Sequence, residues 1–253
     1  MRTQAFFLVF ASGLMFHTAS AQWVQTNGPG GGYVHSFAVS CTNIIAGTWG
    51  GGVFLSTDNG TSWTQTGMTN GTVRALAVSG EKFFAGSYDG VFLSTNNGTS
   101  WTAVDSGLTN TVVLALAVSG GNLFAGTYGG VFLSTNSGTS WTAVNTGLPT
   151  NIAFPALAVS GTNLFAGTEG GGAFLSTNNG TSWTAVNTGL ANTNVHSLAV
   201  SGANLFAGTY GAGVFLSTNN GTSWTSASNG LVSTCVVALA VSGTSLFAGA
   251  VPT

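Results

Sequence analysis

The chain has 253 residues but only three Lys or Arg and five Asp or Glu side chains. Neutralising a nucleic acid backbone requires many cationic side chains, and so does a polybasic contact with a membrane. We therefore expect neither nucleic acid nor a membrane surface as a partner. Disorder is excluded as well, because 44% of the residues are hydrophobic and they fall in short regular runs.

The first 21 residues have the three parts of a secretory signal peptide. Arg2 supplies a positive start, residues 5–16 form a short apolar run, and Ala-Ser-Ala at 19–21 fits a cleavage site. The apolar run is short for a membrane span, which needs about 20 residues. We expect a mature chain that starts at Gln22. It would be exported to the periplasm or the outside of a bacterial cell and would not be inserted in the membrane after cleavage.

The remainder of the chain repeats a unit of about 40 residues. Each unit carries S-T-[N/D]-[N/S]-G-T-S-W-T, and none of its segments shows a helical period. In the second unit, four short apolar or β-branched segments occupy residues 75–80, 82–87, 91–95 and 100–104, separated by Gly, Asn and Ser. A four-stranded unit that repeats with this period predicts the blade of a β-propeller. We therefore expect an all-β fold with a single propeller domain over residues 22–253.

The number of strands predicts a ring with one irregular blade. Five complete units are followed by two more strands at residues 237–243 and 245–249. Residues 23–26, which begin with Trp23, align with the fourth strand of a unit. We interpret the fold as five complete blades and an incomplete sixth, closed by the N-terminal strand. The third strand of the last blade is missing, so we expect the domain to be incomplete at its C-terminal side.

The repeated box S-x-[D/N]-x-G-x-x-W resembles the Asp-box, or BNR repeat, of the sialidase-like propeller superfamily. Its residues are Asp58, Gly60, Trp63, Asn96, Gly98, Trp101, Asn136, Gly138, Trp141, Asn178, Gly180, Trp183, Asn219, Gly221 and Trp224. An Asp or Asn there can hydrogen-bond the backbone of its turn, and the Gly allows a positive φ. The Trp offers an apolar face for packing between blades and an N–H for a nearby acceptor. Because only Asp58 keeps the family's Asp, cation binding at the boxes is disfavoured.

The resemblance suggests sialidase activity first, but the residues do not support it. Sialidases of this superfamily hold the substrate carboxylate with three arginines, and the mature chain has only Arg74. Other Asp-box propellers hydrolyse β-glucans with two carboxylates, which in glycosidases lie about 5–10 Å apart. Asp89 and Glu169 are the candidates, yet they belong to non-adjacent units, and Asp105 is interpreted as a turn variant. We therefore expect no enzyme and no cofactor, with a glycan hydrolase using Asp89 and Glu169 as the alternative.

Metal binding is not supported either. His35 and His196 occupy the same position of the repeat, where other units have Arg74, Leu114 and Val237. Two histidines without a third ligand are weak evidence for zinc. We interpret them as polar residues at the mouth of the central channel and expect no metal site.

We also expect no disulfide. Cys41 and Cys235 align with positions at opposite ends of an extended strand, which places them ~25 Å apart along the strand direction. A disulfide requires Cα atoms within about 7 Å of each other. The sequence therefore predicts two free thiols.

A binding surface is the remaining candidate. Each connection between the second and third strand carries one large side chain: Trp49, Tyr88, Tyr128, Glu169 and Tyr210. In the family architecture these loops share one face with His35, Arg74 and His196, which lie nearer the channel. Aromatic faces suit sugar rings, and phenol groups add hydrogen bonds. The alternative is that each aromatic residue only covers its own glycine-rich loop.

The sequence thus favours a secreted, monomeric, non-catalytic module that recognises a glycan or a protein, or that acts as a scaffold. Related repeats also occur in photosystem assembly factors, which are scaffolds. Their basic binding patches have no counterpart in a mature chain with two cationic side chains.

Overall fold

The structure, a computed structural model, describes residues 28–30, 32–40, 43–69 and 71–252. The described part forms 22 β-strands and no helix. The expected signal peptide, the expected strand at 23–26 and Cys41 lie outside these residues. The described ranges therefore contain no helix that is long and apolar enough to cross a membrane.

Five antiparallel sheets of four strands follow one another along the chain, each in sequential order. The first blade consists of β1 (Val34–Ser40), β2 (Asn43–Thr48), β3 (Gly52–Ser56) and β4 (Thr64–Gln65). The second consists of β5 (Val73–Ser79), β6 (Lys82–Ser87), β7 (Gly90–Ser94) and β8 (Thr102–Ala103). The third consists of β9 (Val113–Ser119), β10 (Asn122–Thr127), β11 (Gly130–Ser134) and β12 (Thr142–Ala143).

The same order continues through the second half of the chain. The fourth blade consists of β13 (Ala156–Ser160), β14 (Asn163–Thr168), β15 (Gly172–Ser176) and β16 (Thr184–Ala185). The fifth consists of β17 (Val195–Ser201), β18 (Asn204–Thr209), β19 (Gly213–Ser217) and β20 (Thr225–Ser226). A last sheet contains only β21 (Cys235–Ser242) and β22 (Ser245–Val251).

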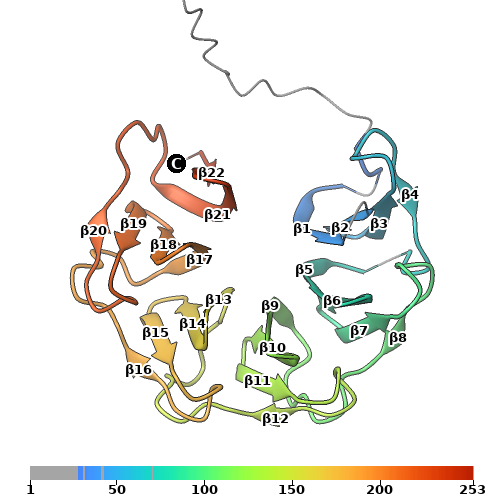
Figure 1. Cartoon of the computed structure of the whole chain (residues 1–253), viewed down its shortest axis with the longest axis horizontal. Coiled ribbons are helices and arrows are strands. Elements are labelled where there is room, and N and C mark those ends of the chain that lie inside the picture. The colour runs from blue at the N-terminus through green and yellow to red at the C-terminus, as the bar shows by residue number, and fades with distance from the viewer. Residues whose placement is uncertain (1–27, 31, 41–42, 70, 253) are drawn as a thin grey trace, which may run out of the picture.

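The sheets are arranged around a centre, and the first strand of each lies innermost (Figure 1). Each inner strand contacts the inner strand of the next sheet, from β1 through to β21. The arc begins at the β1 blade and ends at the β21–β22 sheet (Figure 1). This confirms an all-β propeller with five complete blades and a two-stranded sixth. The proposed closure by residues 23–26 falls outside the described residues.

The hydrophobic core lies between neighbouring blades rather than in one central cluster. Phe84 and Val91 of the second blade pack with Leu123, Phe132 and Trp141 of the third. Phe84 is only 1% exposed, and burying such a side chain contributes about 1.5–3 kcal/mol. In the five complete blades most residues of the second strand are buried, which explains its continuous apolar run.

The outer strands are shorter than the sequence predicted. The expected strand at 100–104 is reduced to β8, in which only Phe92↔Ala103 and Leu93↔Thr102 are paired. Trp101 precedes the paired segment because its indole is directed to the preceding blade, where its N–H binds Thr66 Oγ1. The chain turns again after Ala103, and the Asp105 carbonyl accepts the N–H of Leu108.

Candidate binding face and channel mouth

The box hairpins use their polar groups internally. In the third blade the buried Ser134 Oγ accepts the N–H of Gly138 at 2.8 Å and donates to Asn136 Oδ1 at 2.9 Å. Asn136 Oδ1 also accepts the N–H of Ser140 at 2.9 Å. The corresponding hydrogen bonds recur in the other four boxes. The boxes therefore hold the turn, as the sequence indicated.

Two consecutive residues of each box turn have a positive φ, whereas only the glycine was expected to. In the second blade Asn97 has φ 56° and Gly98 has φ 84°. Asn tolerates this left-handed region better than most residues do. In the third blade the non-glycine position is Ser137, with φ 57°. The sequence signal was the Asn that precedes Gly in four of the five boxes.

The box tryptophans connect neighbouring blades. Trp141 Nε1 donates to the Val104 carbonyl at 2.7 Å, and Trp183 and Trp224 make the equivalent bonds. The buried Nε1 of Trp63 has no hydrogen-bond partner among the described residues. The box end of each blade is therefore an architectural joint. Because the strands are antiparallel, the connections between second and third strands lie at the opposite end.

A β-bulge places one side chain per blade at the channel mouth. The pairing of the first and second strands shifts at the same position in five blades. The extra residues are His35, Arg74, Leu114, His196 and Val237. A bulge redirects a side chain relative to a regular ladder. In the fourth blade Pro155, which cannot donate an N–H to the ladder, precedes β13 at this position.

Sequence reasoning placed His35, Arg74 and His196 near the channel but missed the bulge. The bulge lengthens the first strand to seven residues where the second has six, as in β5 and β6.

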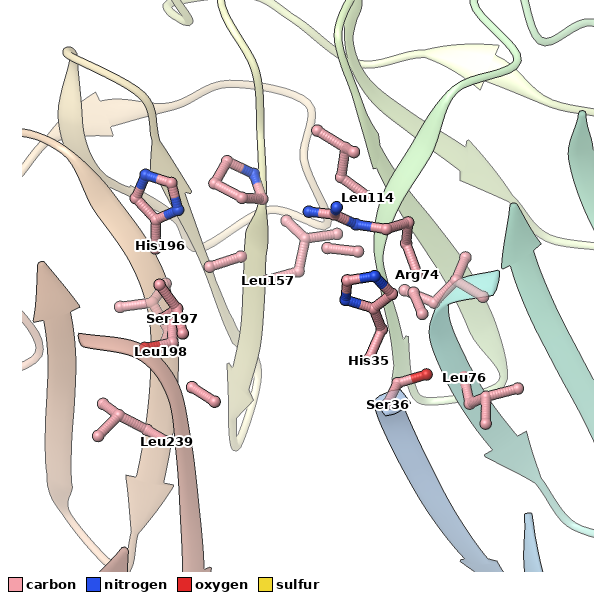
Figure 2. Close-up of a pocket in the computed structure, with 17 residues that line it drawn as sticks. His35, Ser36, Arg74, Leu76, Leu114, Leu157, His196, Ser197, Leu198 and Leu239 are labelled. Carbon is pink, nitrogen blue, oxygen red and sulfur yellow. The ribbon is translucent and has the colours of Figure 1, made fainter. Parts of the chain in front are cut away.

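These bulge residues line a cavity of about 360 Å³ at the channel mouth. It adjoins a second cavity of about 280 Å³, whose walls include leucines two residues further along the inner strands. Figure 2 shows Arg74 and His35 side by side, with His196 across the cavity from them. The inner strands thus bring together three cationic or titratable side chains that are far apart in sequence.

Burial and nearby charge lower the pKa of both histidines, which favours the neutral imidazole. The pKa of His35 is lowered by burial and by the positive charge of Arg74. The pKa of His196 is lowered mainly by burial and also by Arg74, while Glu169 acts in the opposite direction. Arg74 therefore supplies the permanent positive charge of the mouth. None of the hydrogen bonds between described residues involves its guanidinium.

Aromatic side chains surround the mouth on the same face. Trp49 is 49% exposed and contacts His35 and Tyr88, with ring centroids 5.5 Å and 6.1 Å away. Tyr210 is 48% exposed and lies 5.3 Å from the His196 ring. Tyr128, in the third blade, is exposed to a similar extent. The structure thus brings Trp49 and Tyr210 to the two histidines of the channel mouth, and Tyr88 lies against Trp49.

The loops that carry these side chains are fixed by the neighbouring blade connection. The N–H of Tyr210 donates to the Asn194 carbonyl, and the N–H of Glu169 donates to the Ala153 carbonyl. These two bonds attach each loop to the segment that leads into its own blade. The N–H groups of Gly170 and Gly211 donate to the carbonyls of Thr193 and Thr234, in the segments that lead into the next blade. The aromatic side chains are therefore presented from a restrained backbone.

The two candidate catalytic carboxylates have different surroundings. Glu169 lines a pocket of about 180 Å³ with Asn194, His196 and Tyr210. Asp89 is not part of that pocket, and its backbone N–H is bound to Ser87 Oγ. The described residues contain no group of three or more His, Cys, Asp or Glu that could hold a metal. Cys235 is buried and free.

The fold and its face define a β-propeller of four-stranded blades with aromatic side chains beside the channel mouth. Comparison with protein-family models gives no match, and neither does comparison with curated proteins. Solved structures match well. The extracellular domain of the one-component system BT4673 from B. thetaiotaomicron aligns with 86% of this chain and 31% of its own, with a TM-score of 0.73 and 19% identity.

Two further structures have the same architecture. An ancestral GH74 enzyme aligns over 86% of this chain and 34% of its own, with a TM-score of 0.69 and 22% identity. YCF48 bound to D1 peptide aligns over 86% of this chain and 74% of its own, with a TM-score of 0.64 and 14% identity. This chain spans about a third of the length of the BT4673 domain and of the GH74 enzyme. At these identities the likeness establishes the fold alone.

Proposed function

We propose that this chain is a non-catalytic recognition or scaffold module of the Asp-box type, exported to the periplasm or the cell exterior. In this proposal the box hairpins hold the blades, and the opposite face binds a glycan or a protein. The observation that carries it is the convergence of exposed aromatic rings on the channel mouth, with Trp49 against His35 and Tyr210 against His196. Half-exposed aromatic side chains on restrained loops are typical of binding surfaces.

The comparisons support this proposal without deciding it. One structural neighbour is an extracellular domain, and another was solved with a bound peptide. A third is an enzyme, so the fold alone does not separate binding from catalysis.

A triple substitution of Tyr88, Tyr128 and Tyr210 to Ala tests the binding face. We expect loss of binding to any glycan or peptide that the wild type selects from an array, with little change in thermal unfolding, because Tyr128 and Tyr210 are about half exposed. The matched control substitutes three exposed threonines of the outer strands with Ala: Thr102, Thr142 and Thr184. Unchanged ligand affinity in the tyrosine variant would contradict the proposal.

The second candidate function is glycan hydrolysis, and its support is the position of Glu169 in a pocket beside His196 and Tyr210. A panel of chromogenic glycosides separates the two functions. Our proposal expects no hydrolysis above the buffer rate. If the wild type hydrolyses a glycoside and Glu169→Gln abolishes this hydrolysis, the function of this face is catalysis and not binding.

A further inference from the structure

Arg74 lies in the channel mouth as a cation without a protein partner among the described residues. It is partly buried, and the bulge in β5 directs it to the cavity, where Figure 2 shows it beside His35. A guanidinium removed from bulk water is stabilised by an anionic acceptor, and carboxylates match its geometry in a bidentate way. The mouth therefore offers one position for a carboxylate.

The cavity changes from cationic to apolar along the channel. Leu76 follows Arg74 by two residues, which places it about 7 Å further along the strand. Four more leucines occupy the equivalent position of other inner strands and line the same cavity: Leu116, Leu157, Leu198 and Leu239. In the view of Figure 2, Leu76, Leu198 and Leu239 lie below Arg74 and His196. An apolar group attached to the carboxylate would thus meet a ring of leucines.

The charges limit the anion to a single negative charge. Arg74 is the permanent cation of the mouth, while the lowered pKa of His35 and of His196 favours their neutral form. The imidazoles can still donate a hydrogen bond to a carboxylate oxygen. Glu169 interacts with His196 from the rim and repels a second negative charge. A dianion such as phosphate would therefore be poorly matched.

From these contacts we infer that the channel mouth binds a small organic monocarboxylate with a short apolar tail. The carboxylate pairs with Arg74, and the tail enters the leucine-lined part of the channel. The volume of the mouth cavity, about 360 Å³, is in the range of small-molecule sites. This inference rests on the proposed function in that it uses the same face, but it assigns a ligand class and a site distinct from the aromatic rim.

Isothermal titration with hexanoate as the probe tests the inference. We expect one hexanoate per chain, and Arg74→Gln should weaken its binding at least tenfold, which corresponds to the loss of one charge-assisted hydrogen bond pair. Lys82→Gln is the matched control, because Lys82 begins β6 at the other end of the second blade and binds Ser137 Oγ there. The control should bind hexanoate as the wild type does.

Shorter and uncharged probes separate the two parts of the site. Each methylene added between acetate and hexanoate should tighten binding by up to about fourfold, the factor for burying one CH₂. The alcohol 1-hexanol and inorganic phosphate should bind much more weakly than hexanoate. Equal binding of acetate and hexanoate would show that the leucine ring is not used.

Two further variants test the inference even if Arg74→Gln does not fold. Arg74→Lys retains the charge and should bind hexanoate better than Arg74→Gln, a rescue that a merely structural role would not produce. The triple Tyr variant should bind hexanoate normally, so failure of the rim and failure of the channel site are distinguishable. Absence of hexanoate binding to the folded wild type at millimolar concentration, or equal binding to Arg74→Gln, would overturn the inference.

Discussion

Asp58 is the one box residue that carries a charge, and its hydrogen bonds are those of a stabilised carboxylate. It accepts bonds from the Ser62 hydroxyl at 2.6 Å, the Ser62 N–H at 2.9 Å and the Ser56 hydroxyl at 2.8 Å. These bonds lower its pKa from 3.8 to about 2. In the four Asn boxes the side-chain oxygen accepts the equivalents of the Ser56 hydroxyl and Ser62 N–H bonds, whereas the Asn Nδ2 donates to the later serine hydroxyl, as in Asn96 to Ser100. The turn therefore requires an acceptor and not a charge.

This difference predicts a pH dependence confined to the first box. A carboxylate with a lowered pKa in the folded state stabilises the fold above the unfolded pKa of 3.8, and this contribution is lost as pH falls toward about 2. Asp58→Asn should change stability little at pH 7 and should reduce the loss between pH 4 and 2. Urea unfolding of both proteins across this range is the measurement. Parallel stability curves would show that the hydrogen bonds of Asp58 do not distinguish its two protonation states.

Two serines beside the channel bulges point to a different residue-level effect. The hydroxyl oxygens of Ser36 and Ser197 are buried and lack partners among the described residues. Other blades have alanine at this position: Ala75, Ala115, Ala156 and Ala238. The second strand is close there, because a Cβ added to Gly208 would clash with Ser197 Oγ. A hydroxyl in this position is desolvated without compensation.

Ser197→Ala should therefore raise the free energy of unfolding, by about 1 kcal/mol. Ser134→Ala in a box is the opposite case and should lower it by about 1–3 kcal/mol, because the Gly138 N–H would lose its acceptor. Urea unfolding of the two variants against the wild type measures both changes. A destabilised Ser197→Ala variant would indicate that its hydroxyl has a partner outside the described residues.

At the scale of single elements, the tryptophan of the second to fifth boxes links its blade to the preceding one. Trp141→Phe removes a bond to Val104 and should cost about 1 kcal/mol more than Trp63→Phe, which removes none among the described residues. Trp183→Phe and Trp224→Phe should behave like Trp141→Phe, since their indoles make the same bond. Thermal and urea unfolding of the four variants tests this difference. Equal losses at Trp63 and Trp141 would mean that an acceptor for Trp63 lies outside the described residues, as closure by residues 23–26 would require.

The elements also show which parts of the fold a single sequence can predict. The second and third strands were predicted closely because a short apolar run between glycines indicates a strand and also its ends, as β6 and β7 illustrate. The outer strands were predicted too long because Trp and Thr favour a strand by propensity, whereas the tryptophan is held by contacts to another blade. The bulges were missed because a pattern of alternating residues does not reveal which ladder bond is skipped.

At the scale of the whole molecule, the units repeat, so the position of a residue within its unit predicts where it lies on the ring. This is why His35, Arg74 and His196 could be placed near one channel mouth although up to 161 positions separate them. The cavity, the unpaired guanidinium and the contacts of Trp49 with His35 and Tyr88 depend on side-chain directions, which alignment of repeats does not supply. The roles of these residues in binding remain predictions for the titrations and variants described above.

The stability of a repeat protein is approximately a sum over units and their interfaces, so local stability should differ between blades. β10 is almost fully buried between two blades, whereas most residues of β22 are exposed. Its partner β21 packs against β17 and β18 on one side.

Backbone amides of β21–β22 should therefore exchange with solvent about tenfold faster, or more, than those of β9–β10, because local opening disrupts fewer buried contacts. Hydrogen exchange followed by mass spectrometry measures both sheets in the same sample, and the β5–β6 pair serves as a second interior reference. Equally slow exchange in the two sheets would show that a segment outside the described residues covers the sixth blade, and the ring would then be closed in solution.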